Sequence, residues 1–464
     1  MSLIVERVQY GVGQGAFHTQ SITIDEHCIW RCDLHYPESG VRFDFVYDCG
    51  TKGSKVGKAI ANSIKHYKPK GTIDGQTTTE IVDAVFISHF HDDHINGIDQ
   101  LCKAKQVVRI FAPFHTQEDV LAVILRSSSA NIKGAHATLF LTELRNLYRR
   151  ERLFGRPTIY VIPPDMRNEF DPPESLTNPE LPRFPEGVRV SDSVNSKACF
   201  TDDDAIEFGP ANCDWQIWEI KTWHFRQHDP APSAEWQDAI AELGTIFGTI
   251  FSNTAAIDAA ASEDLLKKAA MIRQKMCVAL QIEEVEHAGN HNLVSMCVYS
   301  GPADCNRPWA TSTIISRMNG PNSGSILAGT HLDFALHSPK FGYLRGESHF
   351  ADQVSNRTGW LGTGDALLGN PTVWQDFENR LEWQDRSENV ATVQVPHHGS
   401  AGDYYNSDLF DNSEILAVIS AGAYSSYGHP AVAVLSDILQ RGNPVVHIHE
   451  FVRPGLIEIV KVDY

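Results

Sequence analysis

The period of the apolar positions changes sharply at residues 88–94. Residues 81–87, just before, are almost all apolar and rich in β-branched side chains, which is typical of a buried strand. Ile95, Ile98 and Leu101 then recur at helical spacing, which predicts a helix that begins within the stretch. Histidines and carboxylates stand between the two patterns. A polar cluster is therefore expected in the loop that leaves a buried strand.

The same patterns predict further elements. Apolar runs with alternation predict strands at 5–10, 16–24, 43–47, 107–110, 158–162, 215–223, 293–299, 415–420 and 444–462. Helical periodicity predicts helices at 52–70, 120–125, 136–152, 235–251 and 255–284. Lysines line the first of these helices, which indicates a solvated face. Residues 163–212 and 300–356 are rich in loop-forming residues, so both ranges are expected to be loops.

Composition and charge set broad limits on function. The chain has 464 residues and a net charge of −19, so its overall field repels polyanions and argues against broad, non-specific DNA binding. The nine cysteines are dispersed without a close CxxC pair, which favours reduced thiols and a cytoplasmic protein. No run of about 18 apolar residues occurs, so neither a signal peptide nor a membrane association is expected.

The stretch from His89 to His94 holds the residue types that bind transition metals. His89, His91 and Asp93 are spaced two apart and can face one side of an extended segment. Neutral imidazole and carboxylate suit zinc, manganese or iron, and two such clusters side by side can hold two ions. A lone histidine is more often a surface or core residue, but this combination rarely arises by chance, even among 21 histidines. The stretch therefore predicts a metal site.

Other short motifs follow along the chain, and each is weak alone. Asp48 ends a predicted strand beside a glycine turn, where it would also serve as a cap. Asp365 follows a Gly-Thr-Gly segment and is expected on a tight turn. The pair at 397–398 and His429 each follow a predicted strand. The glycine-rich segment 11–15 lacks the Lys-Ser/Thr of a phosphate-binding loop, so we expect a plain turn there.

Taken in order, these motifs resemble the metallo-β-lactamase-fold domain of the competence protein ComEC and its soluble relatives. That family reads Val-Gly-Gln-Gly, Asp-x-Gly, a His-rich motif, Thr-Gly-Asp, Pro-His-His-Gly-Ser and Gly-His-Pro, and the matching segments here are 12–15, 48–50, 89–94, 363–365, 396–400 and 428–430. The resemblance implies an α+β fold, an αββα sandwich with halves at 1–115 and 286–464 and a loop insertion at about 300–356. Residues 116–285 are then a partly helical insertion that covers or flanks the site.

The resemblance also implies a dinuclear centre that holds two divalent metal ions, zinc by preference and manganese as the alternative. The implied ligands of one ion are His89, His91 and, as the candidate third ligand, His291, with His224 and His287 as lesser candidates. The implied ligands of the other ion are Asp93, His94 and one of the 397–398 pair, with His398 favoured over His397. Asp365 would bridge the two ions. Asp48 would orient the ligands from behind.

The implied reaction is hydrolysis by a water that the two ions activate. Asp93, His397, His429 and Ser400 form the expected catalytic group, in which His429 and Ser400 donate to a phosphoryl oxygen. A phosphodiester is the favoured substrate, in a small molecule or in nucleic acid. Hydrolysis of a carboxylic ester, lactone or amide, and a binding module without activity, are the alternatives. Ala16 departs from the family, which commonly has an acid there.

Overall fold

The fold is that of a computed structural model of the chain. The predicted helix at 136–152 and the candidate ligands His287 and His291 lie outside the described residues. The structure describes residues 2–25, 41–52, 57–69, 80–114, 121–122, 124–125, 157–162, 183–185, 187–191, 200–201, 204–209, 216–226, 233–252, 259–280, 294–303, 311–319, 353–354, 357–411, 415–423, 425, 428–450 and 455–463.

The first sheet contains nine strands, and its two edge strands come from distant parts of the sequence. In spatial order the strands are β12 (Gln353–Val354), β11 (Thr311–Asn319), β17 (Gly455–Asp463), β1 (Ser2–Tyr10), β2 (Phe17–Asp25), β3 (Val41–Cys49), β4 (Ile81–Phe86), β5 (Gln106–Pro113) and β6 (Thr158–Ile162). Neighbours from β12 to β3 are antiparallel, whereas those from β3 to β6 are parallel. The predicted strand at 81–87 is confirmed as β4, which lies between two parallel neighbours, where an apolar run is expected.

The second sheet contains eight strands. In spatial order they are β16 (Val445–Ile448), β15 (Leu416–Ser420), β14 (Val390–Gln394), β13 (Gly359–Gly362), β10 (Val294–Pro302), β9 (Trp218–Arg226), β8 (Ala205–Phe208) and β7 (Val188–Arg189). Neighbours from β16 to β13 are parallel, and those from β13 to β7 are antiparallel. Both sheets are thus mixed, and the chain combines them with helices, which is compatible with the expected α+β class.

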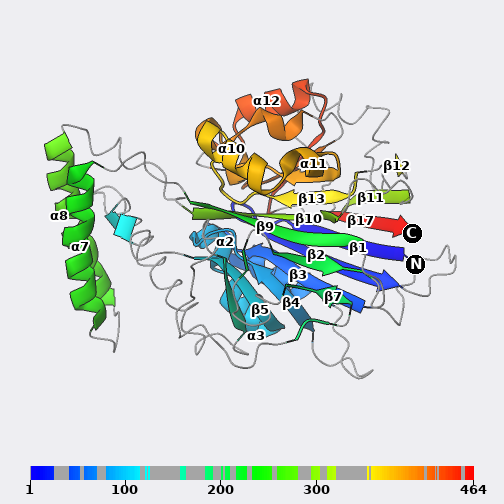
Figure 1. Ribbon diagram of the computed structural model, residues 1–464, viewed down its shortest axis with the longest axis horizontal. Coiled ribbons are helices and arrows are strands. Elements are labelled where there is room, and N and C mark those ends of the chain that lie inside the picture. The colour runs from blue at the N-terminus through cyan, green and yellow to red at the C-terminus, as the bar shows by residue number, and fades with distance from the viewer. Residues whose placement is uncertain are drawn as a thin grey trace.

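Helices lie on both sides of the strands (Figure 1). Side chains of α10 (Pro371–Arg380), α11 (Trp383–Ser387) and α12 (Val432–Gln440) pack with the second sheet, and those of α1 (Gly57–His66), α2 (Asp92–Ile95) and α3 (Ile98–Ala104) pack with the first. The predicted helix start within 88–94 is confirmed by α2. Of these helices, α2 and α3 in particular carry the chain from the end of β4 to β5.

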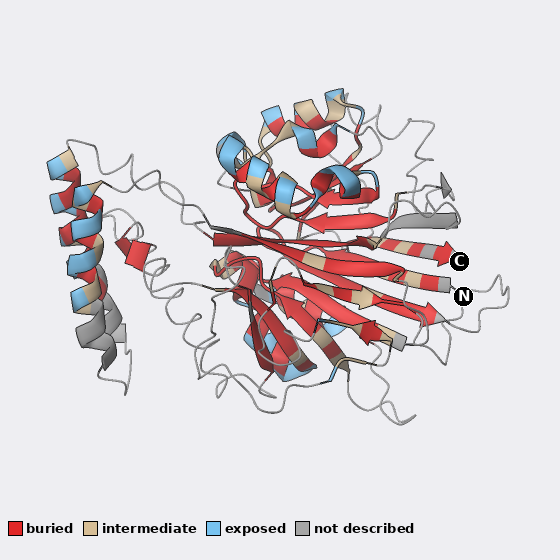
Figure 2. Ribbon diagram, in the orientation of Figure 1, coloured by how far each residue is buried: buried red, intermediate tan, exposed pale blue. Residues whose placement is uncertain are grey.

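Buried apolar side chains form separate cores in this arrangement. One core joins the sheets, with Phe43 and Phe86 from the first meeting Trp218 and Met296 from the second. Another contains side chains of the first sheet with those of α1 and α3. A further one contains side chains of the second sheet with those of α10, α11 and α12. Figure 2 shows that the strands are buried along most of their length, because side chains pack on both of their faces.

The range 116–285 contributes to both sheets. It supplies β6 to the first sheet and β7, β8 and β9 to the second. It also contains α7 (Ala234–Ser252) and α8 (Ala259–Leu280), which pack against each other at the left of Figure 1, on the side where α2 lies. The division of the chain at 116 and 285 stays a prediction, but this range is not only helix and loop. None of the described helices combines the length and apolar character needed to cross a membrane.

Several strands lie in ranges whose composition predicted loops. Strands β7 and β8 fall within 163–212, and β11 and β12 fall within 300–356, so the loop prediction is wrong at these positions. Strand β11 pairs with β17 along its whole length, from Thr311 opposite Asp463 to Asn319 opposite Gly455. Its stability therefore comes from a partner far away in the sequence, which local composition does not reveal.

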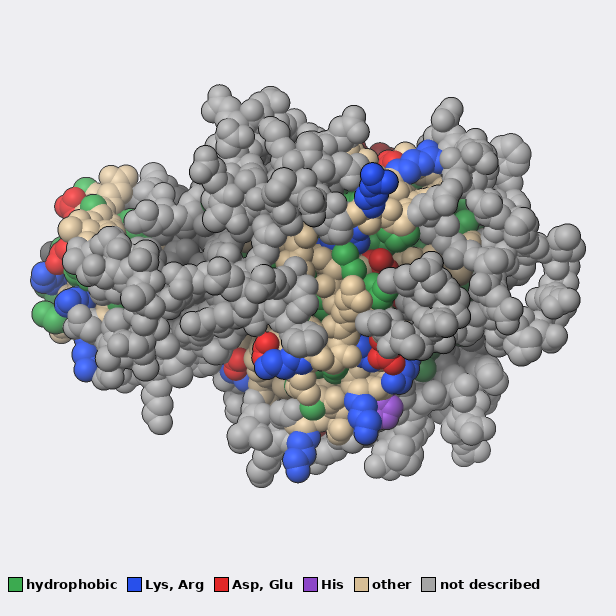
Figure 3. Space-filling view, turned by 90° about the horizontal axis from the view of Figure 1, so that it is seen from below, with side chains coloured by type: hydrophobic (Ala, Val, Ile, Leu, Met, Phe, Trp, Pro, Cys, Tyr) green, Lys and Arg blue, Asp and Glu red, His purple; other side chains and the backbone are tan. Residues whose placement is uncertain are grey.

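The predicted lysine-bearing helix is confirmed in part as α1, which is shorter than 52–70. Lys58 and Lys65 on it are exposed, and Lys68 beyond its end pairs with Glu80 at 2.9 Å. Figure 3, which views the molecule from below, shows Lys and Arg side chains interspersed with Asp and Glu on the described part of that face. The mixture of signs is typical of a solvated surface rather than of a polyanion-binding patch.

Asp83 on β4 is a carboxyl group in an unfavourable setting. Its Oδ2 accepts the backbone N–H of Asp44 at 2.9 Å. Burial, together with the charge of Asp44, raises the pKa of Asp83 from 3.8 to about 7, although Arg109 and Arg42 act in the opposite direction. Between these two pKa values the folded chain keeps a proton that the unfolded chain has released, so stability falls as pH rises through this window.

We predict that Asp83→Asn removes this pH dependence. The amide oxygen can still accept the Asp44 N–H, but it carries no charge at any pH. The unfolding free energy of the variant minus that of the wild type should therefore increase from pH 4 to pH 7 and level off above. Urea unfolding of both proteins across this range, in EDTA, measures it. A difference that is constant with pH would show that Asp83 titrates normally.

Candidate metal centre

Polar side chains from both sheets converge at the carboxyl ends of parallel strands. In the first sheet, Asp48 lies at the end of β3 and residues 88–94 follow β4. In the second sheet, Asp365 follows β13 and the turn Pro396–Gly399 follows β14. Loops at the carboxyl ends of parallel strands meet at one edge of a sheet, which is where ligands commonly bind. The two sheets therefore bring motifs from distant parts of the chain to one place.

Glycines allow the supporting loops to approach α2. A Cβ atom on Gly15 would lie 2.6 Å from the carbonyl oxygen of Asp93, and one on Gly50 would lie 2.5 Å from the same atom. The backbone N–H of Ala16 donates to that carbonyl at 3.2 Å. The turn at 11–15 therefore supports the backbone at the candidate ligand Asp93. Neither Gly15 nor Gly50 has room for a side chain.

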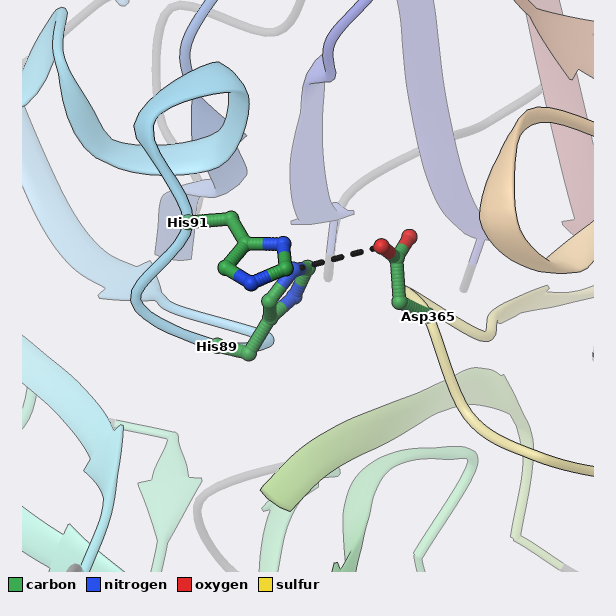
Figure 4. Close-up of side chains that lie close together, drawn as sticks. All are labelled: His89, His91 and Asp365. Carbon is green, nitrogen blue, oxygen red and sulfur yellow. Dashed lines mark ion pairs between the residues drawn. The ribbon is translucent and has the colours of Figure 1, made fainter. Parts of the chain in front are cut away.

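The first group of candidate ligands contains His89, His91 and Asp365 (Figure 4). One ligand atom of each residue lies within 4.8 Å of the others. The histidines come from the loop after β4, and Asp365 approaches from the second sheet, with its Oδ2 at 3.3 Å from Nε2 of His89. His89 and Asp365 are buried, whereas His91 is partly exposed. This group can hold a metal ion.

The second group contains Asp93, His94 and His398, again with ligand atoms within 4.8 Å of one another. Nε2 of His398 lies 3.5 Å from Oδ2 of Asp93, and all three side chains are buried. Asp365 stands between the groups, because its Oδ1 lies 3.5 Å from Nε2 of His94 while its Oδ2 faces His89. The two oxygens of one carboxylate thus face one imidazole of each group.

Hydrogen bonds from behind orient two of the imidazoles. Nδ1 of His94 donates to Oδ2 of Asp48 at 2.8 Å. Asp48 is itself held by Ser88, whose backbone N–H and hydroxyl both donate to its carboxylate at 2.7 Å. Nδ1 of His398 donates to the backbone carbonyl of Ser420 at 2.6 Å. Because Nδ1 carries the proton in each ring, Nε2 is the atom that can bind a metal.

Burial and donor chemistry at the site both fit a metal ion. The Nε2 atoms of His94 and His398 are buried and make no hydrogen bond among the described residues. Such an atom ordinarily costs about 1–3 kcal/mol of stability if nothing satisfies it. Coordination of a cation would satisfy it, and imidazole with carboxylate is a ligand set suited to zinc.

The charges of the site oppose the effect of burial. Burial raises the pKa of Asp365, but the nearby imidazoles outweigh it and hold the pKa well below its ordinary value. Burial acts in the same way on Asp93, and the nearby imidazoles of His398 and His94 outweigh it, so the pKa of Asp93 is also lowered. Burial lowers the pKa of His94, yet Asp48 and Asp365 raise it to about 9. Ionised carboxylates are therefore present at the position where a cation would bind.

His397 belongs to neither ligand group, although it precedes His398. Its Nε2 lies 3.5 Å from Oδ2 of Asp365, and its ring packs against Tyr404 with centroids 3.9 Å apart. Burial lowers the pKa of His397 to about 4, so this ring is neutral near pH 7. It borders the ligands as a neutral donor or acceptor, and His398 is the member of the pair within the ligand set.

His429 and Ser400 lie at the margin of the site. The His429 ring is 5.3 Å from that of His397 between centroids and is partly exposed, and burial lowers its pKa. The hydroxyl of Ser400 donates to the carbonyl of Ala401 at 3.4 Å. His224 lies on β9, opposite Met296, and belongs to neither ligand group. The roles assigned to these residues from the sequence stay predictions.

Sequence reasoning overlooked Ser88 and Ser420. The oxygen of the Ser88 hydroxyl lies 2.9 Å from Nδ1 of His89 and also contacts Asp48, so this one residue contacts a candidate ligand and the acid that supports His94. Its position directly before the first histidine of the motif was a visible signal. Ser420 acts through its backbone carbonyl, for which side-chain chemistry provides no signal.

Comparisons with known proteins do not assign the chain to a family. No protein-family model matches it, and no curated protein sequence matches it. The arrangement of these side chains is therefore the basis for any statement about function.

We predict that Gly50→Ala destabilises the protein and disturbs the site. Its Cβ would lie 2.5 Å from both the carbonyl oxygen of Asp93 and the backbone nitrogen of His94. The backbone at the start of α2 has to shift, which should lower the unfolding free energy by about 1–3 kcal/mol. Denaturant unfolding in EDTA measures the loss, and zinc titration measures the disturbance.

Gly244→Ala in α7 is the matched control. Its Cβ would meet the Leu121 side chain at 3.4 Å, an ordinary contact, and alanine favours a helix over glycine by about 1 kcal/mol. This variant should be as stable as the wild type or more so. Equal unfolding free energies for the two variants would contradict the close approach of Gly50 to α2.

Proposed function

We propose that this protein is a dinuclear metal-dependent hydrolase of the metallo-β-lactamase type that cleaves a phosphodiester. One observation carries the proposal: Asp365 lies between two ligand groups, His89 with His91 on one side and Asp93 with His94 and His398 on the other. A carboxylate in that position suits a bridge between two cations.

The arrangement of the cores supports the proposed αββα sandwich. Apolar side chains of the two sheets meet in one core, and each sheet shares a further core with helices. That order of packing is what a four-layer sandwich requires. The ligand groups lie at strand ends of both sheets, as a site at the edge of such a sandwich would.

The residues present would hold two ions, with zinc preferred and manganese as the alternative. Imidazole-rich sets with a few carboxylates favour zinc among the available divalent metals. When bound, a pair of such ions would lower the pKa of a water molecule and polarise a phosphoryl oxygen. Asp93 and Asp365 contribute negative charge that offsets the repulsion between the cations, and Asp48 fixes the orientation of His94.

The other residues proposed for catalysis surround the ligands. His429 is partly exposed and would donate to a phosphoryl oxygen of the substrate, as would His397, which stays neutral because of its lowered pKa. Ser400 is the weakest member of the group, because its hydroxyl donates to Ala401. We assign the substrate to phosphodiesters, in a small molecule or in nucleic acid, and the enzyme to the cytoplasm, since the buried cysteines of the described residues are free thiols.

We predict two zinc or manganese ions per chain and a loss of both hydrolysis and one ion in Asp365→Asn. The amide keeps the shape of the carboxylate but not its charge, so repulsion between the ions should release the more weakly held ion and reduce activity at least about 100-fold. Elemental analysis and hydrolysis of a chromogenic phosphodiester, with lactones and nucleic acids assayed in parallel, measure both.

Asp408→Asn, a change at an exposed carboxylate, is the control and should leave both quantities unchanged. If Asp365 were only a turn residue, asparagine would replace it well, since it favours the same turns. Unchanged metal content and activity in Asp365→Asn would therefore contradict the proposed bridge. A wild-type protein that takes up no zinc or manganese would contradict the proposal that the protein is a metal-dependent hydrolase.

We further predict different results for the two adjacent histidines. His398→Ala removes a ligand and should reduce the metal content to about one ion per chain, with little residual activity. His397→Ala leaves both ligand groups intact and should keep two ions, while the turnover rate falls about 100-fold because a neutral donor beside Asp365 is lost. The opposite pattern of metal content would mean that the ligand assignment within this pair is wrong.

A further inference from the structure

A chain of hydrogen bonds crosses the buried core between the two sheets. The indole N–H of Trp218 donates to Oγ of Ser300 at 2.9 Å. The hydroxyl of Ser300 donates to Oε1 of Gln20 at 2.9 Å. Nε2 of Gln20 lies 3.1 Å from Nε2 of His18. All four side chains are buried, so this chain of polar groups is shielded from water.

This series of hydrogen bonds ends next to a candidate metal ligand. Nδ1 of His18 lies 3.2 Å from Oε1 of Gln9, and Nε2 of Gln9 donates to the hydroxyl of Ser420 at 3.1 Å. Ser420 is the residue whose carbonyl accepts Nδ1 of His398 at 2.6 Å. These hydrogen bonds link six residues to His398, and we call the six the inter-sheet network: Trp218, Ser300, Gln20, His18, Gln9 and Ser420.

The donor and acceptor roles follow one order along the inter-sheet network. An indole N–H can only donate, so Ser300 accepts from Trp218 and has to donate to Gln20 Oε1. The amide of Gln20 then donates to Nε2 of His18, which places the proton of His18 on Nδ1. A reversed arrangement would leave the Ser300 hydroxyl without an acceptor among the described residues. Burial and the charge of Arg7 keep the pKa of His18 well below its ordinary value, so its ring stays neutral.

Packing alone does not explain these polar residues. On β1 and β2 the core-facing pair Val5 and Ile22 is apolar, whereas the core-facing pair nearer the site is Gln9 and His18. Apolar side chains of similar shape would fill such a core with equal or greater stability. The change from apolar to polar occurs toward the end where the ligands lie, which points to a role in the site.

The position of Ser420 shows what that role is. Ser420 lies beyond the last pairing of β15 with β14, at Val418, so in its own sheet only β16 flanks it, through Ile448. The bond from Gln9 to the Ser420 hydroxyl comes from the first sheet and ties the end of β15 to β1. We infer that Gln9 and His18 are positioning residues that, through Ser420, hold the His398 ring with Nε2 toward Asp93.

A first experiment tests the inference with no metal present. Long-range proton–nitrogen NMR spectra of the protein labelled at histidine, in EDTA, report which ring nitrogen carries the proton. His18 and His398 should both be protonated at Nδ1, with His18 unchanged from pH 6 to 9, and His18→Asn and His398→Ala assign their signals. In Gln9→Met, which retains volume but cannot hydrogen bond, His398 should become a mixture of tautomers. A His398 signal unaffected by Gln9→Met would overturn the inference.

A second experiment measures zinc affinity and rests on the proposed function. Gln9→Met and His18→Leu should weaken the more weakly bound zinc about tenfold or more, as expected when a group behind a ligand is removed. His18→Asn can keep a donor to Gln9 near the position of Nδ1, so its affinity should stay near the wild-type value. Tyr299→Phe is the control, because it removes a partly buried hydrogen bond, to the Pro302 carbonyl, between residues outside both ligand groups.

The two experiments separate the inference from the proposed function. If the wild type binds no zinc but Gln9→Met shows the tautomer change, the proposed hydrolase function is rejected and the positioning of His398 by Gln9 is supported. Zinc affinity that falls equally in Tyr299→Phe and Gln9→Met would reject the positioning role, because the loss would then follow from general destabilisation.

Discussion

The structure of the site depends on holding carboxylates among imidazoles away from water. Asp93 and Asp365 are buried, and an isolated carboxylate in such a place is strongly unfavourable. The surrounding histidines lower the pKa of both acids, so the acids stay charged although they are buried. Cations between the two ligand groups would restore the balance of charge. Such a balance requires ligands at fixed distances, and the ends of buried strands provide them.

The same requirement explains the close packing behind the ligands. The backbone at Asp93 rests on the turns that contain Gly15 and Gly50, at distances that leave no space for a Cβ atom. Asp48, two residues before Gly50, reaches His94 from the same turn. Gly50 and Asp48 are therefore both delivered by the end of β3, so a small shift there would displace both. This coupling gives two otherwise ordinary glycines a direct effect on the ligands.

The sequence predicted the elements that are local in origin. The apolar run of β4, the change of period at α2 and the order of the histidine and aspartate motifs all follow from neighbouring residues. It could not predict β11, because that strand depends on β17, or β7 and β8, which lie in a range of loop composition. It favoured His398 over His397 only through the family resemblance, and the three-dimensional arrangement shows which ring meets Asp93. Ser420 acts through a backbone atom and was not predictable for the same reason.

The turn that carries His397 and His398 lowers the stability of the fold. His397 and His398 both adopt left-handed backbone conformations, with φ of 45° and 57°, which ordinarily cost about 1–3 kcal/mol each for residues other than glycine. Such a turn persists only where its surroundings determine it. The N–H of His397 donates to the carbonyl of Gly364 at 2.9 Å, which ties the turn to the residue before Asp365. The ring of His398 is tied to Ser420. The strained turn and the polar core behind it thus serve one purpose, to fix one imidazole against one carboxylate.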